Sequence, residues 1–199
     1  MKIPLFFLFA VAGWAQIERP QLGLMLDADG ALRPVYGAAA SATLGDPVLT
    51  GVLSFGCSAR LCLLKTDTAI IASDGTSAAA PAGTAIFAMD GASAYVYFPE
   101  SEQWARWHDG QLEWIDFAPD EAVSTGTVMQ LEDGALTATS DHIALVRGDG
   151  SELDFEVANV QQFFAMGKGY VQVVAKTGLW ILRVEPGREQ IFLLPGIPE

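Results

Sequence analysis

Glycines at turn positions recur along the chain in two interleaved series, and this regularity limits the possible fold more than any other feature. The spacings are 35, 43 and 35 residues in one series and 35, 40 and 37 in the other. The first series is Gly56, Gly91, Gly134 and Gly169, and the second is Gly75, Gly110, Gly150 and Gly187. Asp-Gly, which occurs six times, favours a hairpin between apolar runs because both turn residues tolerate a positive φ. Each repeat therefore reads as strand, turn, strand, connection, strand, turn, strand.

The repeat predicts an all-β fold of four four-stranded antiparallel units, at about residues 50–82, 83–122, 126–158 and 161–195. Residues 22–37 resemble half of a further unit and are expected to form an extra N-terminal hairpin. The stretch after Gly75 is rich in small residues, so the last strand of the first unit should be a weak edge. Four strands in about 40 residues are typical of a β-propeller blade. A β-sandwich or an open meander is the alternative.

Many of the expected strands are apolar on both sides, as required when a sheet packs between two others. In the second unit, Tyr95 and Tyr97 should point one way while Val96 and Phe98 point the other. Sandwich strands would alternate more cleanly between a buried and a wet face. The pattern therefore favours the propeller-like arrangement.

From Leu22 to Leu194 the sequence resembles β-propeller repeat proteins, and within them an uncharacterised exported bacterial group. The resemblance is architectural. No unit ends in the Trp-Asp pair of WD40 repeats, and none carries the paired glycines of kelch repeats or a Ser-x-Asp-x-Gly-x-x-Trp box. It thus implies a fold and transfers no functional residues.

Residues 1–15 have the pattern of an export signal. Lys2 precedes ten apolar residues, Ile3 to Ala12, and small residues follow at Gly13 and Ala15, where a signal peptidase could cut. An uncleaved anchor is the alternative, but ten apolar residues fall short of the roughly 20 that span a bilayer. We expect cleavage near Ala15 and a single propeller-like domain over residues 16–199. The mature chain, without a membrane span, would be periplasmic or secreted.

The two cysteines, Cys57 and Cys62, have the spacing of a cross-strand disulfide that closes the four-residue loop Ser58–Leu61. Export permits such a bond. Buried free thiols are the alternative. A metal site would need more ligands.

Composition and motifs argue against several functions. The chain has 24 acidic and 11 basic residues and a net charge of −13, whereas a nucleic-acid partner needs a basic face. Ser140, Asp141 and His142 have the residue types of a hydrolytic triad, but neighbours on an extended chain point in opposite directions. With His108 as the only other histidine, no zinc-type spacing exists. We expect no catalytic residues, no metal and no cofactor.

The densest feature is an aromatic cluster in the second unit. Its members are Tyr95, Tyr97, Phe98, Trp104, Trp107, Trp114 and Phe117. Trp104, Arg106 and His108 should share one side of a strand, where they could stack and hold a sugar or an aromatic ligand. The alternative is that these rings fill the space between blades.

These observations favour an exported, soluble binding or scaffold module without an evident catalytic site, whose ligand is a protein or a carbohydrate. One alternative is a carbohydrate-active or other hydrolytic enzyme that uses acidic residues on the ring face. Another is a degenerate partial propeller that forms a homodimer through an open sheet edge. The sequence leaves the question of enzymatic activity open while leaning against it.

Overall fold

The computed structural model describes residues 20–38, 41–90, 93–116, 127–167 and 169–194. Within these ranges the chain forms β-strands and no α-helix, so the all-β, propeller-like fold class is confirmed. The expected signal segment, residues 1–15, lies outside the described residues.

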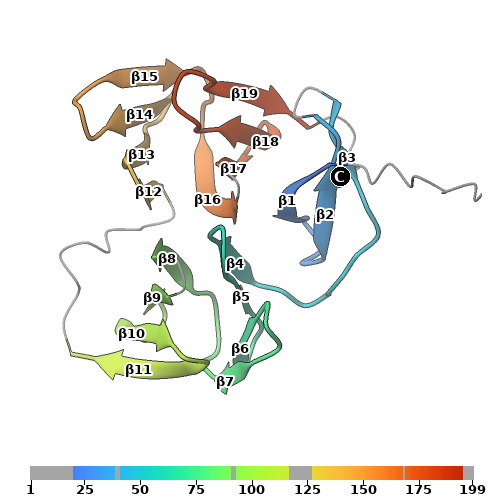
Figure 1. The fold of residues 1–199 in the computed structure, drawn as a ribbon, viewed down its shortest axis with the longest axis vertical. Helices are drawn as coiled ribbons and strands as arrows, with labels where there is room; N and C mark the ends of the chain where they lie inside the picture. Colours follow the sequence, from blue (N-terminus) through green and yellow to red (C-terminus); the bar gives the residue numbers. More distant parts are fainter. Residues whose placement is uncertain (1–19, 39–40, 91–92, 117–126, 168, 195–199) are drawn as a thin grey trace, which may run out of the picture.

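The strands form four antiparallel units of four consecutive strands, here called the first to fourth sheets, of which the first and fourth are joined between β4 and β16 into one eight-stranded ladder (Figure 1). The first sheet comprises β4 (Ser54–Cys57), β5 (Cys62–Lys65), β6 (Ala69–Ala72) and β7 (Ser77–Ala79), and the second comprises β8 (Ile86–Asp90), β9 (Ser93–Phe98), β10 (Gln103–His108) and β11 (Gln111–Ile115). The third comprises β12 (Val128–Leu131), β13 (Gly134–Ala138), β14 (Ile143–Arg147) and β15 (Glu152–Phe155), and the fourth comprises β16 (Val160–Gly167), β17 (Tyr170–Ala175), β18 (Gly178–Arg183) and β19 (Gln190–Leu193). The three-residue β7 is the weak edge expected after Gly75.

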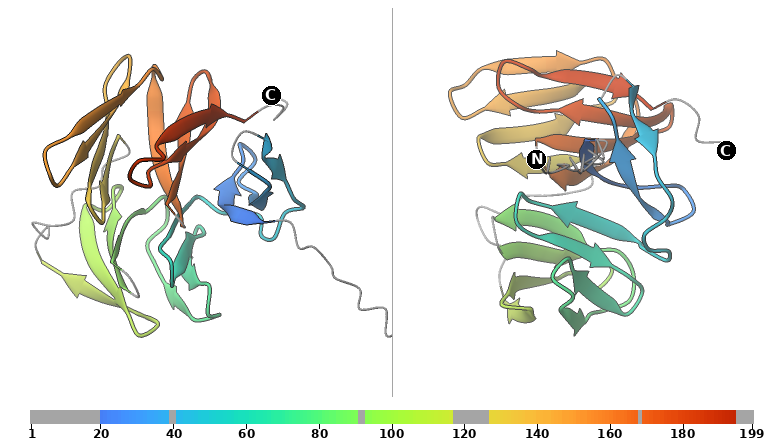
Figure 2. Two further views of the ribbon diagram at one scale, coloured as in Figure 1. Left: turned by 45° about the horizontal axis from the view of Figure 1, so that its top comes forward. Right: turned by 45° about the vertical axis from the view of Figure 1, so that its right-hand side comes forward.

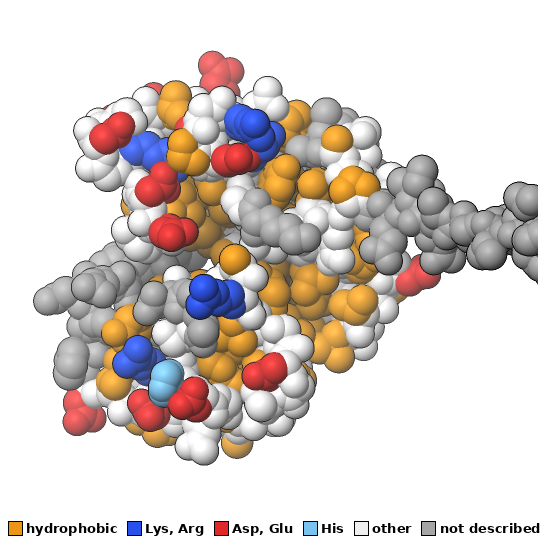
Figure 3. Space-filling view, in the orientation of Figure 1, with side chains coloured by type: hydrophobic (Ala, Val, Ile, Leu, Met, Phe, Trp, Pro, Cys, Tyr) orange, Lys and Arg blue, Asp and Glu red, His pale blue; other side chains and the backbone are white. Residues whose placement is uncertain are grey.

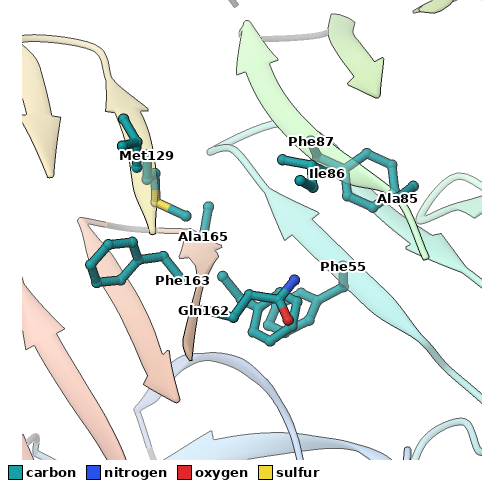
Figure 4. A pocket seen from close by; sticks show the side chains of 10 residues that line it. Phe55, Ala85, Ile86, Phe87, Met129, Gln162, Phe163 and Ala165 are labelled. Carbon is teal, nitrogen blue, oxygen red and sulfur yellow. The ribbon is translucent and has the colours of Figure 1, made fainter. Parts of the chain in front are cut away.

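The innermost strands β4, β8, β12 and β16 meet around the centre of the molecule (Figures 1 and 4). The cavity between them measures about 10 Å³, about enough for one water molecule. Apolar side chains surround it, with Gln162 as the polar exception. The first and fourth sheets join here through one parallel bridge between Cys57 and Met166. The described side chains therefore leave space for about one water molecule at this point.

The N-terminal residues form a separate three-stranded sheet of β1 (Gln21–Leu26), β2 (Leu32–Tyr36) and β3 (Thr43–Leu44). The expected hairpin thus gains a short third strand. The sheet packs beside the fourth sheet without joining its strand ladder (Figure 2). The side chain of Gln172, which is fully buried, accepts a hydrogen bond from the Leu26 N–H (2.9 Å) and donates one to the Leu26 carbonyl (2.7 Å). These two bonds provide partners for the backbone N–H and carbonyl of Leu26, the last residue of β1.

The two glycine series have different structural roles. Every member of the second series, Gly75, Gly110, Gly150 and Gly187, has a positive φ, as does Gly169 of the first series. Gly56 was expected at a turn but lies inside β4, and Gly134 begins β13 without a positive φ. A Cβ at Gly56 would lie 2.8 Å from the Phe87 Cβ, so this glycine lets β4 approach the second sheet. Gly91 lies outside the described residues.

Cys57 and Cys62 lie directly opposite each other on β4 and β5 and form the expected disulfide, with their Cα atoms 4.0 Å apart. The Ser58 N–H donates to the Leu61 carbonyl (2.8 Å) across the loop that the bond closes. Because this loop is short, the disulfide acts as a local clip.

Three apolar clusters hold the sheets together. One joins the N-terminal sheet to the first and fourth sheets, one joins the first to the second, and one joins the third to the fourth. Polar contacts reinforce them: the Ser54 hydroxyl bonds both the carbonyl and the N–H of Ala85, and the Arg147 guanidinium bonds Asp133 and Glu189. Among the described residues no apolar cluster joins the second and third sheets. Apolar packing on both faces is therefore seen for the first and fourth sheets, whereas the described residues of the second and third sheets show it on one face each.

Candidate functional site

The second sheet has one half-exposed face, which we call the open face. Side chains alternate between the two faces of each strand, and the pairing of β8 to β11 places eleven described side chains on this one. They are Ile86, Ala88, Ser93, Tyr95, Tyr97, Trp104, Arg106, His108, Gln111, Glu113 and Ile115. The open face is therefore unusually rich in aromatic rings beside charged and amide groups.

The opposite face of the same sheet belongs to the core that it shares with the first sheet. Val96, Phe98 and Ala105 are fully buried there, and Trp107 is 2% exposed. This burial fixes the sheet and its register. The open-face side chains are consequently held on a rigid support.

Two ring contacts organise the open face. Tyr97 and Trp104 stack across β9 and β10, with ring centroids 4.7 Å apart and planes inclined by 28°. One row further along, the Arg106 guanidinium carbon lies 5.9 Å from the centroid of the Tyr95 ring, a cation–π distance. These contacts pre-organise the rings while leaving them half-exposed.

The polar groups of the open face have few partners within the protein. Arg106 lies opposite Glu113 across β10 and β11, yet neither makes a hydrogen bond or ion pair with another described residue. Gln111 is exposed and equally free of such partners among the described residues. His108 is half-exposed, with Nε2 3.3 Å from Asp109 Oδ2. The face thus offers both donors and acceptors to a ligand.

The sequence placed part of this face correctly. Trp104, Arg106 and His108 lie together on it, and Tyr95 and Tyr97 point away from Val96 and Phe98 as expected. The aromatic cluster is otherwise divided between two environments. Trp107 and Phe98 are core residues, and Trp114 is 51% exposed beside Phe98 on the other face. Phe117 lies outside the described residues.

Sequence reasoning missed the residues that β8 and β11 contribute, among them Ile86, Gln111, Glu113 and Ile115. A signal was available for β11. A two-residue turn at Asp109-Gly110 pairs His108 with Gln111, and antiparallel counting then sets Arg106 opposite Glu113. For Ile86 the pair Asp90-Gly91 offered a similar anchor, but the structure pairs Asp90 with Ser93, so the exact register of β8 had to come from the structure.

The third sheet also presents an uncovered face to the same junction. Its core face packs against the fourth sheet, so the remaining face turns toward the second sheet (Figure 1). Thr137, Val146, Glu152 and Asp154 lie on it, and His142 Nε2 is 3.6 Å from Asp154 Oδ1. Figure 3 shows hydrophobic, basic, histidine and acidic side chains intermixed over the second sheet, below the furrow that separates it from the upper sheets.

The three residues with the side chains of a hydrolytic triad lie in a turn. Ser140, Asp141 and His142 form the connection from β13 to β14, where the Thr139 N–H donates to the His142 carbonyl (2.9 Å). Hydrogen bonds from His142 and from the Thr139 hydroxyl lower the pKa of Asp141 below its ordinary value. This carboxylate is therefore engaged within its own turn, and among the described residues the His142 ring contacts the Thr139 hydroxyl and Asp141 and no serine hydroxyl.

The central cavity has no Asp or Glu in its lining, so a pair of carboxylates suited to glycoside hydrolysis is not found there. Within the described part of the chain, no group of three or more His, Cys, Asp or Glu side chains could hold a metal ion. None of the described segments is a helix long and apolar enough to cross a membrane.

No protein-family model matches the sequence, and no curated protein matches it. Three solved structures are similar over most of the chain. PorZ, a surface component of the type-IX secretion system of Porphyromonas gingivalis, is 11% identical with a TM-score of 0.32, over 90% of this chain and 26% of PorZ. Virginiamycin B lyase from Staphylococcus aureus is 12% identical with a TM-score of 0.32, over 89% of this chain and 71% of the lyase.

The third structure, BBS1N in complex with ARL6DN, is 9% identical with a TM-score of 0.34, over 87% of this chain and 81% of the matched chain. The chain thus spans about a quarter of the length of PorZ. Similarities this low carry no activity or partner over to this protein. The functional assignment therefore starts from the open face.

Proposed function

We propose that the protein is an exported, non-catalytic binding module that takes its ligand on the open face of the second sheet. One observation carries the proposal: a stacked pair of half-exposed rings, Tyr97 and Trp104, lies beside Arg106 and Glu113, which make no hydrogen bond or ion pair with another described residue. Half-exposed aromatic rings with adjacent donors and acceptors are the usual components of a binding surface.

Burial of the opposite face supports this role. The residues behind the open face, such as Val96 and Trp107, are fixed in the core, so binding requires little reorganisation of the sheet. A surface of this kind can serve a carbohydrate or a protein ligand. Catalysis is less well supported, because Glu113 is the one carboxylate among the described side chains of the open face, while Glu152 and Asp154 are exposed on the outer strand of the third sheet.

Trp104→Ala tests the proposal, with Trp114→Ala as the matched control because Trp114 is more exposed but lies on the other face. We would measure co-sedimentation of the purified mature protein with insoluble cellulose, chitin, starch and collagen. The proposal predicts that at least one of these polymers retains the protein. Trp104→Ala should weaken that retention by about tenfold, while Trp114→Ala leaves it unchanged. Retention by none of them, or equal loss in both variants, would overturn it.

Export is part of the proposal. The disulfide between Cys57 and Cys62 supports an oxidising compartment, since such bonds rarely persist in a reducing cytosol. Mass spectrometry of the protein recovered from the periplasm or medium of an expressing bacterium tests it. A mature chain that begins at Gln16 is expected, and a full-length chain retained in the cytoplasm would contradict export.

A homodimer through an open sheet edge is the second form that this module could take. Each propeller-like sheet ends in an unpaired outer strand, such as β11 or β15. Light scattering after size-exclusion chromatography distinguishes the forms. A monomer of about 20 kDa at every concentration, from a chain of 21.2 kDa before processing, would exclude the dimer.

A further inference from the structure

We infer that Asp109 and Gly110, the turn that joins β10 to β11, form a self-modification site at which Asp109 converts to isoaspartate through a cyclic imide. This modification is independent of the proposed binding function. Three features of the turn lead to it: an accessible carboxyl group, an unbonded backbone amide, and the contrast with the other Asp-Gly turns.

The reaction needs these two residues and no cofactor. The Gly110 nitrogen attacks the Cγ atom of the protonated Asp109 side chain and closes a five-membered ring, while the amide hydrogen and the carboxyl hydroxyl leave together as water. Water then opens the ring at the main-chain carbonyl of Asp109, so that the chain continues through Cγ. Opening at the Cγ carbonyl restores aspartate. Glycine favours the attack because no side chain stands beside its nitrogen.

The carboxyl group of Asp109 is accessible. Its side chain is 88% exposed, and its close polar neighbour is His108, whose Nε2 lies 3.3 Å from Asp109 Oδ2. Among the described residues no backbone N–H or hydroxyl donates a hydrogen bond to this group. The carboxyl group can therefore turn toward the Gly110 nitrogen without losing such a bond.

The amide of Gly110 is also unbonded. The turn has two residues, because His108 pairs with Gln111, and both Asp109 and Gly110 have a positive φ, of 48° and 76°. Within the described part of the chain the Gly110 N–H donates to no carbonyl and to no side chain. The attacking nitrogen is thus available in the folded protein.

The turn at Asp149 protects the same two groups. Its carboxylate accepts hydrogen bonds from the Ser151 hydroxyl (2.7 Å) and N–H (2.9 Å), and the Gly150 N–H donates to the Arg147 carbonyl (2.9 Å). The bonds from Ser151 lower the pKa of Asp149, so less of it is in the protonated form that an amide attacks. The turn at Asp74 has the same arrangement.

Other Asp-Gly pairs have at least one of the two groups engaged. Both carboxylate oxygens of Asp133 accept from the Arg147 guanidinium, and the Gly30 N–H donates to a carbonyl of its own turn (3.1 Å). The pair at residues 90–91 lies partly outside the described residues. Among the pairs that the structure describes in full, Asp109-Gly110 is therefore the one with both groups unbonded.

Isoaspartate at this position would change the edge of the second sheet. It adds one carbon to the main chain between His108 and Gln111, which are directly paired. β11 is the outer strand and pairs with β10 alone, so the longer turn should loosen β11 and leave the other strands in place.

Incubation of the purified mature protein at about pH 5 and about pH 8 tests the site. Peptide mass spectrometry locates isoaspartate, and enzymatic methylation of its free α-carboxylate quantifies it. Synthetic peptides of residues 105–115 and 145–155 give the rates without a fold. We expect Asp109 to react within about tenfold of its peptide, because no part of the fold must open, and Asp149 at least about tenfold more slowly than Asp109. The rate at Asp109 should be higher at the lower pH, where more of the carboxyl group is protonated.

Two variants assign the product to this turn. Asp109→Glu keeps the charge but would have to close a six-membered ring, so it should form no isoaspartate at this position. Asp109→Asn reaches the same imide by losing ammonia and should form isoaspartate faster. Hydrogen exchange of β11 (Gln111–Ile115) should become faster on incubation of the unchanged protein and stay constant in Asp109→Glu. Equal rates at Asp109 and Asp149, or a rate at Asp109 more than about tenfold below that of its peptide, would overturn the inference.

Discussion

The two faces of the second sheet have nearly the same aromatic content, but one is mostly buried and the other is half-exposed. One face, with Phe98 and Trp107, is sealed against the first sheet, and the other, with Tyr97 and Trp104, is left half-exposed toward the third. The sealed face has a matching apolar surface and the hydroxyl of Ser54 as a polar link. The open face has a cation, a carboxylate and an amide among its rings. Ring content therefore does not decide burial here: one face shares an apolar cluster with the first sheet, and the described residues show no such cluster on the other.

The largest expected effect separates the two tryptophans of β10. Trp107→Ala removes a side chain that is 2% exposed and should lower the free energy of unfolding by about 3–5 kcal/mol. Trp104→Ala should lower it by only about 1 kcal/mol, because that ring is half-exposed and its main loss is stacking on Tyr97. Urea unfolding followed by circular dichroism measures both. Similar losses would mean that the faces are not energetically distinct.

The polar link of the sealed junction comes next. Ser54 is fully buried; its hydroxyl donates to the Ala85 carbonyl (2.6 Å) and accepts from the Ala85 N–H (3.1 Å). Ser54→Ala leaves both groups unsatisfied, at about 1–3 kcal/mol for each. Ser151→Ala in an exposed turn is the control, with an expected change within about 0.5 kcal/mol. Equal unfolding curves for the two variants would show that water replaces the hydroxyl.

Close approach of backbones marks the sealed junction as well. Gly56→Ala would place a Cβ 2.8 Å from the Phe87 Cβ, and the forced separation of β4 and β8 should cost about 1–3 kcal/mol. Gly148→Ala is the matched control, because its Cβ would meet only the Asp133 carbonyl oxygen at 3.6 Å and its φ is not positive. Thermal unfolding compares them. A Gly56→Ala protein as stable as the control would contradict tight packing at this point.

The smallest expected effect concerns pH at another sealed junction, between the third and fourth sheets. Arg147 donates to both carboxylate oxygens of Asp133 and to Glu189 Oε1 (2.8 Å). A hydrogen bond from its own backbone N–H, followed by the one from Arg147, lowers the pKa of Glu189 below its ordinary value of 4.5.

Because the folded-state pKa of Glu189 is lowered, its contribution to stability is complete above the ordinary value and is lost as the pH falls through the folded-state value. Glu189→Gln should therefore reduce the stability lost between about pH 6 and about pH 3, as measured by urea unfolding across this range. Other carboxylates with lowered pKa values, such as Asp27 and Glu100, keep part of the slope in the variant. If the free energy of unfolding fell equally with pH in both proteins, Glu189 would not contribute to the loss of stability in acid.

Local sequence signals predicted the strands and most turns, because an Asp-Gly pair and alternating side chains act over a few residues. Gly110 and Gly150 have the positive φ that such turns require. Gly56 misled the register because a glycine also serves where two backbones meet, and only the packed structure distinguishes the uses. β3 has two residues, too few for a pattern.

For the open face, the sequence predicted which side chains lie together on a strand but not how the neighbouring sheets are placed. Alternation predicted that Trp104, Arg106 and His108 share a side, since that depends on one strand. Whether that side is covered depends on how the second and third sheets sit, which no local pattern encodes. The repeat suggested that each sheet is enclosed, and the structure shows one junction without a shared core.

The contact between Leu26 and Gln172 joins residues 146 positions apart. During synthesis, the N-terminal sheet therefore waits for the last sheet before its apolar side finds its partner. Contacts of such high sequence separation slow folding. The N-terminal sheet therefore reaches its final packing only when nearly all of the sequence is available.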